Sequence, residues 1–344
     1  MKRLLFSIVL ALCCLSGSAA DGVVRIGIIG LDTSHSARFS EVLNNAASDD
    51  YFVKKYEVVA AYPYGTKTIP SATSRIEGFT KEVQKYGVEI VGSIDELLDK
   101  VDCVFIETND GRLHLEQAAK VFKSGKKCYI DKPLGSTLAE SMAIYELASK
   151  YNRPVFSSSA LRFSTINADI RAGKYGKVKG ADCYSPHHPE SAIDNDGKMS
   201  HPDFGYYGIH GVEILYTVMG TGCDYVSRVH STEGDIVLGV WKDGRLGTFR
   251  AITTKPNIYG GTVILEKEQM QAGGYMGYKV LLDAVLTFFE NDVPPVSKEE
   301  TLEMFAFMEA SNVSLQKGGK NVKLADVYKK AEKQAAKLLK PYLN

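Results

Sequence analysis

The chain has 344 residues, more than one ordinary hydrophobic core holds and about the length of two domains. Hydrophobic residues make up 44% and charged residues 24%, a balance typical of a soluble globular protein. Lys and Arg together number 41, as do Asp and Glu, so no excess of charge attracts nucleic acid or anionic lipid. We therefore expect a small-molecule ligand and no nucleic-acid partner.

The first residues are predicted to form a secretory signal peptide, residues 1–20. Two basic residues precede an apolar run, which ends at Leu15 and is followed by small residues. This order is that of a signal removed on export, and we expect cleavage after Ala19 or Ala20. The mature protein is then periplasmic or secreted.

The cysteines of this segment do not favour a lipoprotein. Leu12 stands before Cys13, where lipid attachment requires a small residue. The apolar run is too short to span a bilayer, and no other segment has the length of a membrane span. The cysteines beyond the signal match no zinc motif; they are Cys103, Cys128, Cys183 and Cys223.

Short apolar runs alternate with helical segments over residues 21–160. The predicted strands are residues 23–29, 58–61, 101–106, 127–130 and 154–157. The predicted helices are residues 36–45 and 114–123, a short helix opened by the capping box Ser93–Glu96, and one from the capping box Thr137–Glu140 to about residue 150. Such alternation predicts βαβ units and a Rossmann-type parallel sheet.

A different pattern begins after residue 160. Asp243-Gly244 marks a hairpin turn between two predicted strands. The strands are residues 180–184, 225–230, 236–241, 246–252 and 262–265, and the helices are one capped by Ser297 that ends near residue 316 and one over residues 324–339. We predict a C-terminal α+β domain, residues 161–344, with a mixed, largely antiparallel sheet.

The turn after the first strand is where a dinucleotide fingerprint, G-x-G-x-x-G, would lie. Its glycines allow a tight turn and close approach of the backbone to a pyrophosphate. Here the sequence is GLDTSH: Gly30 matches the first glycine, but Asp32 and His35 replace the other two. A carboxylate beside a pyrophosphate is electrostatically unfavourable, and the acidic residue that usually ends the second strand is absent. The pattern therefore indicates the fold and leaves cofactor binding open.

Three stretches carry a resemblance to a known family. Residues 107–135 look like a strand–helix–strand that ends in E-K-P-L, with Asp131 in place of the glutamate. Residues 205–220 look like a G-x-H-x-x-D segment, and residues 294–297 with the helix after them look like a closing segment. In this order they resemble the Gfo/Idh/MocA family of sugar and polyol oxidoreductases, over roughly residues 22–326.

The resemblance implies roles for particular residues. Lys132 would lie beside the nicotinamide and hold the reacting hydroxyl, and His210 would be the acid–base group, which suits its titration near neutral pH. Tyr206 stands four residues earlier, so that one helix would place both on the same face. The predicted catalytic residues are thus Lys132, His210 and Tyr206. The residues predicted at NAD or NADP are Gly30, Leu31, Asp32, Thr33, Ser34, His35, Asn109, Asp131 and Lys132, and those at the substrate are Arg162, His188, Asp203 and Glu213.

One polar loop concentrates histidines and carboxylates. Its members are His187, His188, Glu190, Asp194, Asp196, His201 and Asp203. Such side chains can bind a divalent metal, but their spacing matches no known motif. We expect a solvated loop at the pocket mouth, assign no metal, and leave metal binding there open.

Three functions remain open at this point. The first is NAD(P)-dependent oxidation of a sugar, polyol or glycoside hydroxyl, with the cofactor held tightly and re-reduced in each cycle, because export makes free cofactor scarce. The second is a cofactor-independent lyase, isomerase or hydrolase on an oxidised sugar, which the altered fingerprint favours. The third is a non-catalytic carbohydrate-binding protein. We rank the first ahead, and the resemblance implies a homo-oligomer, either a dimer or a tetramer.

Overall fold

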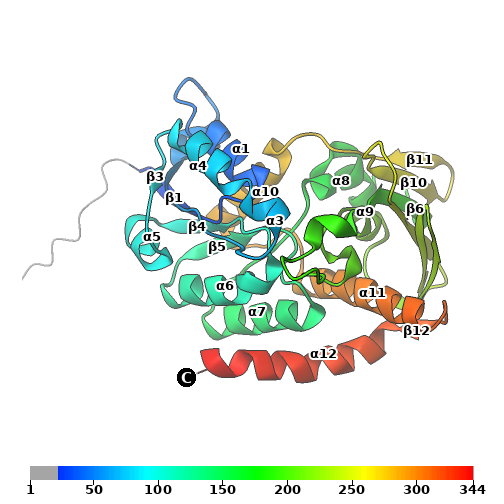
Figure 1. The fold of residues 1–344 in the computed structure, drawn as a ribbon. Coiled ribbons are helices and arrows are strands. Elements are labelled where there is room, and N and C mark those ends of the chain that lie inside the picture. Colours follow the sequence, from blue (N-terminus) through cyan, green and yellow to red (C-terminus); the bar gives the residue numbers. More distant parts are fainter. Residues whose placement is uncertain (1–21, 344) are drawn as a thin grey trace, which may run out of the picture.

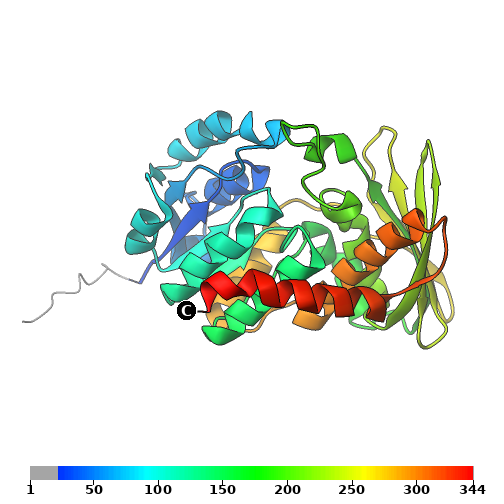
Figure 2. The same cartoon turned by 60° about the horizontal axis from the view of Figure 1, so that its bottom comes forward.

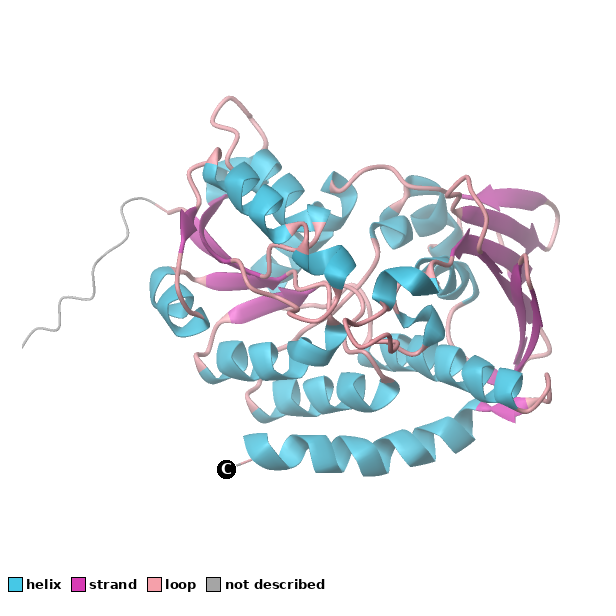
Figure 3. Ribbon diagram, in the orientation of Figure 1, coloured by secondary structure: helices cyan, strands magenta, loops and turns pink. Residues whose placement is uncertain are grey.

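The computed structural model describes residues 22–343, so the predicted signal peptide lies outside the described residues. Two sheets stand at opposite ends of the molecule, with helices between and around them (Figures 1 and 3). One sheet has five strands and the other seven. The predicted fold class, a Rossmann-type domain followed by an α+β domain, is confirmed.

The first sheet is parallel throughout, in the order β3-β2-β1-β4-β5. Its strands are β1 (Val24–Ile29), β2 (Tyr56–Tyr62), β3 (Glu89–Ile90), β4 (Cys103–Ile106) and β5 (Lys127–Ile130). Ile26, Ile28 and Ile29 of β1 are all fully buried. An apolar run of this kind forms a strand that helices cover on both faces.

Helices from both halves of the chain cover this sheet. One face packs against α5 (Ile94–Lys100), α6 (His114–Lys123) and α7 (Leu138–Lys150). The other face packs against α1 (Ser34–Leu43), α4 (Ile76–Gln84) and α10 (Lys279–Asn291). The two shorter helices of this half are α2 (Tyr51–Lys55) and α3 (Pro70–Thr73). The capping box at Thr137 forms as predicted and begins α7.

The first sheet and the helices on it differ from the prediction in several elements, since β3, α2, α3 and α4 were not predicted. Residues 154–157 form no strand, because a single backbone hydrogen bond, from Ile130 N to Phe156 O at 3.4 Å, connects them to β5. Helix α10 was not predicted, although Leu281, Leu282, Val285 and Leu286 recur at helical spacing and are buried. Helix α10 lies far from the first sheet in sequence, so only the fold shows that it packs on that sheet.

The second sheet has the order β11-β10-β6-β9-β8-β7-β12. Strands β6 and β9 pair in parallel, and the other pairs are antiparallel. The strands are β6 (Val178–Pro186), β7 (Cys223–Ser231), β8 (Gly234–Trp241), β9 (Leu246–Ile252), β10 (Gly260–Leu265), β11 (Gln269–Ala272) and β12 (Val322–Lys323). The mixed, largely antiparallel sheet is therefore confirmed, with β11 and β12 as additions.

Helices α9 (Ile209–Met219) and α11 (Lys298–Gln316) pack on the inner face of this sheet, and α8 (Thr165–Arg171) packs on α9. The last helix, α12 (Leu324–Leu339), runs back along α7 of the first half (Figure 2). Both α10 and α12 thus cross the predicted domain boundary at residue 160. Within the described residues, no helix is both long and apolar enough to cross a membrane.

The turn after β1 needs a glycine at its first position. Gly30 has φ +92°, a left-handed conformation that side chains rarely adopt. A Cβ atom there would lie 2.6 Å from the backbone nitrogen of Thr108, at the end of β4. This close approach explains the one fingerprint glycine that the chain retains.

Candidate functional site

The candidate active site is a pocket lined by residues of both halves of the chain. Its volume is about 330 Å³. The lining comprises the first turn of α1, the residues after β4 and β5, the start of α9, and a group of tyrosines. The lining residues are Thr33, Ser34, His35, Arg75, Asn109, Lys132, Ser159, Ala160, Leu161, Tyr206, Tyr207, His210, Tyr259, Tyr275 and Tyr278.

Lys132 reaches this pocket from the carboxyl end of β5. The side chain is half-buried and makes no hydrogen bond or ion pair with another residue between 22 and 343. Ligand sites in parallel sheets lie at this edge. The ammonium group is thus available to a ligand oxygen.

His210 faces Lys132 from the first turn of α9. Its Nδ1 lies 2.8 Å from the Ser159 hydroxyl oxygen. Burial, and next the charge of Lys132, hold the pKa of His210 well below its ordinary value. The imidazole is therefore neutral at neutral pH and has a free nitrogen lone pair with which to accept a proton.

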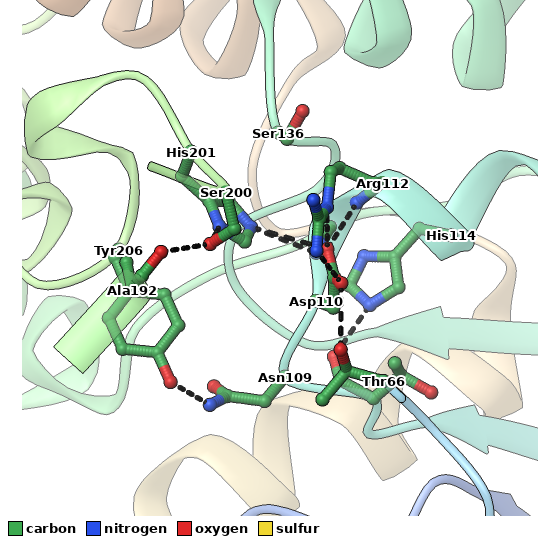
Figure 4. Close-up of polar contacts among 12 residues, drawn as sticks. Thr66, Asn109, Asp110, Arg112, His114, Ser136, Ala192, Ser200, His201 and Tyr206 are labelled. Atoms are coloured by element: carbon green, nitrogen blue, oxygen red, sulfur yellow. Dashed lines mark hydrogen bonds and ion pairs between the residues drawn. The ribbon is translucent and has the colours of Figure 1, made fainter. Parts of the chain in front are cut away.

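Tyr206 lines the same pocket, but not in the predicted way. Helix α9 begins at Ile209, after a 3₁₀ turn at Asp203–Gly205, so Tyr206 and His210 do not share a helical face. The Tyr206 hydroxyl instead lies in hydrogen-bond contact with the Asn109 side-chain amide (Figure 4). This contact joins the loop after β4 to the loop before α9.

A buried polar network surrounds that contact (Figure 4). Gly111 N donates to His201 Nε2 at 3.0 Å, and Arg112 pairs with Asp194 at 2.7 Å. Burial lowers the pKa of His201 to about 4, so its imidazole is neutral and can accept this bond. The network fixes the second-half loop against the end of the first sheet.

The polar loop of residues 187–203 does not gather at one point. His187 pairs with Asp203 at 2.8 Å, and His188 Nε2 lies 2.8 Å from the Asn257 side-chain oxygen. Asp194 is held by Arg112. The loop therefore distributes its histidines and carboxylates among separate partners.

The four residues predicted to contact substrate are not part of the pocket lining. Arg162 and Glu213 are buried in the core, where Arg162 pairs with Glu213 at 2.5 Å and with Glu300 at 2.6 Å. Asp203 pairs with His187 and Arg228, and His188 stacks edge-on against Tyr207. Each of the four thus contacts other protein groups and lies outside the pocket lining.

The predicted cofactor residues divide into two groups. Those that line the pocket are Thr33, Ser34, His35, Asn109 and Lys132. Gly30, Leu31, Asp32 and Asp131 lie behind the lining. The carboxylate of Asp32 turns away from the pocket and accepts the N–H groups of Asn109, at 2.9 Å, and of Thr66, at 3.3 Å.

This arrangement bears on whether a dinucleotide fits. The α1 N-terminus opens on the pocket with no side chain capping it, and such a terminus attracts phosphate. Asp32 lies behind the turn, so its carboxylate does not occupy the place of the phosphates. Arg75, a cationic lining residue, makes no ion pair within the described part of the chain. The residues thus fit an anionic group such as a pyrophosphate.

Asp32 gives a prediction on stability. Burial raises its pKa to about 6 from an ordinary 3.8, so the native state binds this proton more tightly than the unfolded chain. The resulting stabilisation is complete below about pH 3.8 and is lost as pH rises to about 6, a change of about 3 kcal/mol. Urea unfolding measures this change on Asp32→Asn, which does not titrate. Between pH 4 and 7, the free energy of unfolding of the variant should rise relative to that of the wild type by most of that amount. Parallel profiles would contradict the prediction.

Behind the lining, His35 meets two carboxylates. Its Nδ1 lies 2.8 Å from Asp131 Oδ2 and 3.6 Å from Glu107 Oε2. Burial lowers the pKa of His35, but Asp131 and then Glu107 raise it to about 10. Burial and the Asp131 charge raise the pKa of Glu107 to about 7. Glu107, the residue after β4, was not singled out from the sequence.

Several lining residues had no signal in the sequence. Tyr259, Tyr275 and Tyr278 come from loops and a helix start with no recognisable motif, and Tyr207 lies in the G-x-H-like segment but was not singled out. The Tyr278 hydroxyl lies 2.8 Å from the Ser34 hydroxyl, and thus over the start of α1. Arg75 and Ser159 are likewise isolated in the sequence, and only the fold brings them to the pocket.

Comparison with known proteins relates the first half of the chain to a family. Residues 24–159 match the family model described as "Oxidoreductase family, NAD-binding Rossmann fold", GFO_IDH_MocA. The N-terminal domain belongs to the Gfo/Idh/MocA oxidoreductase family. A curated relative, the uncharacterized oxidoreductase YhhX of Escherichia coli, is 22% identical over 138 residues, which span 39% of this chain and 40% of that protein.

Solved structures of similar fold cover more of the chain. A putative myo-inositol dehydrogenase from Sinorhizobium meliloti has a TM-score of 0.69 at 17% identity, covering 88% of this chain and 100% of its own. Scyllo-inositol dehydrogenase from Lactobacillus casei, solved with NAD(H) and scyllo-inositol, has a TM-score of 0.68 at 17% identity, with 88% and 99% covered. At these identities the likeness establishes the two-domain fold alone.

Proposed function

We propose that the protein is an NAD(P)-dependent oxidoreductase that acts on a secondary hydroxyl of a sugar, polyol or glycoside. One observation carries the proposal. Lys132 from β5, His210 from α9 and the uncapped N-terminus of α1 line a single pocket. The family match of residues 24–159 and the substrates named for the inositol dehydrogenases of similar fold support the same chemistry.

The two polar side chains divide the work at the substrate hydroxyl. Lys132 donates a hydrogen bond to the hydroxyl oxygen and stabilises the negative charge that develops there. His210 is neutral and accepts the hydroxyl proton, and Ser159 orients its ring through Nδ1. The Tyr206 hydroxyl accepts a hydrogen bond from the Asn109 side-chain amide, which holds the tyrosine ring at the substrate side of the pocket.

The α1 end of the pocket suits the cofactor. Thr33, Ser34 and His35 would place their backbone at the phosphates, with Arg75 supplying positive charge. When bound, NAD(P) supplies the hydride acceptor. Tyr206, Tyr207 and Tyr259 would then enclose the substrate and exclude water from it.

Export is a further part of the proposal. A periplasmic or secreted oxidoreductase meets little free cofactor, so tight binding and a redox-neutral cycle follow. The substrate is a small carbohydrate, and the second sheet would form the interface of a dimer or tetramer.

One observation favours a second candidate. Tyr278 already bonds Ser34 across the start of α1, at 2.8 Å, which narrows the phosphate end of the pocket. In that case His210 and Lys132 act without a cofactor, as base and oxyanion stabiliser of a lyase or isomerase on an oxidised sugar.

Nucleotide content distinguishes the two candidates. The mature protein is purified, denatured, and the released supernatant is assayed for NAD(H) and NADP(H), with titration of the stripped protein alongside. We expect close to one nucleotide per chain. An empty protein that also fails to bind millimolar NAD(P) would reject the redox proposal and leave the cofactor-independent one.

A further inference from the structure

A buried cluster of one histidine and two carboxylates lies behind the pocket. His35 comes from α1, Glu107 directly follows β4, and Asp131 directly follows β5. One ligating atom of each lies within 4.8 Å of the others. Because the carboxyl ends of neighbouring parallel strands meet at one edge, the fold itself brings Glu107 and Asp131 together.

Glu107 cannot be explained by the protein groups around it. Its side chain is fully buried, and neither of its carboxylate oxygens has a hydrogen-bond partner. Buried polar groups are almost always hydrogen-bonded, so an orphaned carboxylate indicates a missing water or ion. Within residues 22–343, no Lys or Arg nitrogen lies within 4 Å of Glu107 or Asp131. Among the described residues, His35 is the one basic side chain within 4 Å of the two carboxylates, and Lys132 acts on them from farther away.

We propose that His35, Glu107 and Asp131 bind one divalent transition-metal ion, of which Zn²⁺ is the type. Ligands about 2.0–2.1 Å from a tetrahedral ion lie about 3.3 Å from one another. The separations from His35 Nδ1, 2.8 Å to Asp131 and 3.6 Å to Glu107, lie on either side of that value. The ion also gives the orphaned Glu107 oxygens a partner.

The donor set selects the kind of ion. One imidazole nitrogen and two carboxylate oxygens suit Zn²⁺ and its neighbours. Mg²⁺ and Ca²⁺ prefer six or more oxygen ligands, which three side chains do not supply. A divalent ion also cancels the charge of the two buried carboxylates, with the imidazole bound neutral.

The ion would not be sealed within the core. His35 is 8% exposed and lines the pocket, whereas Glu107 and Asp131 are at 0%. Three protein ligands leave a fourth position, and His35 borders the pocket. Water or a ligand oxygen would fill that position.

Metal content tests the proposal without any assay of activity. The protein is produced without a polyhistidine tag, purified without chelator, and analysed by inductively coupled plasma mass spectrometry. We expect close to one transition-metal ion per chain. Chelator-treated protein should rebind one equivalent of Zn²⁺ and, with Co²⁺, give the visible absorption of a tetrahedral site.

Glu107→Gln is the decisive variant, because it keeps the shape and removes the charge. It should weaken Zn²⁺ binding by roughly 100-fold or more. Glu309→Gln is the control for the same chemical change: that carboxylate is half-buried, accepts a hydrogen bond from Leu138 N at 2.7 Å, and lies outside the cluster. It should bind Zn²⁺ as the wild type does.

If Glu107→Gln does not fold, the wild type alone decides. Zn²⁺ should raise its Tm by roughly 3 °C or more over the chelator-treated protein. Wild-type protein with no metal and no Zn²⁺-dependent Tm shift would overturn the proposal. Protons shared among the three side chains would then balance the charge of the cluster. Equal Zn²⁺ binding by wild type and Glu107→Gln would overturn it too. Nucleotide content is measured separately, so the two proposals stand or fall independently.

Discussion

Replacing Lys132 with alanine is expected to lower kcat by about 10²–10³-fold while the fold and nucleotide content persist. The ammonium lines the pocket and makes no hydrogen bond or ion pair with another described residue, so its removal leaves no protein group unpaired. Loss of one preorganised donor to a developing oxyanion has an effect of this size. Turnover is measured on a panel of polyols, sugars and glycosides with NAD⁺ and NADP⁺.

Lys123→Ala is the control for this prediction, because Lys123 is an exposed lysine at the end of α6. It should retain wild-type kcat. The outcome also separates an enzyme from a binding protein, since the latter would lose only affinity. A Lys132→Ala protein with kcat within threefold of the wild type would remove the residue from the chemistry.

The second large effect is expected on stability, from Arg162→Ala. Arg162 is buried between Glu213 and Glu300, at 2.5 Å and 2.6 Å. Its removal leaves two carboxylates in the core, of which Glu300 keeps Arg171. Breaking a buried pair from one side costs about 3–5 kcal/mol, so the free energy of unfolding should fall by that much.

Urea unfolding measures this change, with Arg38→Ala as the control. Arg38 forms an exposed pair with Glu41, and its loss should cost under about 1 kcal/mol. If Arg162→Ala were as stable as the wild type but showed a raised KM, Arg162 would be a substrate residue after all, and its placement in the core would be wrong.

The pattern of strands and helices was predictable because it depends on local spacing. Three elements have the bounds expected from the sequence: α6 at residues 114–123, β5 at 127–130 and β9 at 246–252. Their apolar periodicity, together with capping residues such as Thr137, is contained in the segments themselves. The strand predicted at residues 154–157 was wrong because an apolar run becomes a strand only if a neighbouring strand pairs with it.

The site was predictable only where a residue ends an element. Lys132 follows a strand and His210 begins a helix, and both line the pocket. The sequence does not distinguish an arginine that binds a ligand from one that neutralises core carboxylates, so Arg162 was misplaced. Glu107 was overlooked because its partners, His35 and Asp131, are distant in the chain and only the sheet edge brings them together.

The return of α10 to the first sheet has a consequence for how the molecule can be divided. Leu282, Val285 and Phe288 complete the core that contains Ile28 and Phe105. A fragment ending at residue 160 would keep α1 and α4 on that face but would expose to water the apolar side chains that α10 covers, and so would be prone to aggregate. The Rossmann half is therefore not an independently folding domain. Its core can be completed only after α10 has been synthesised.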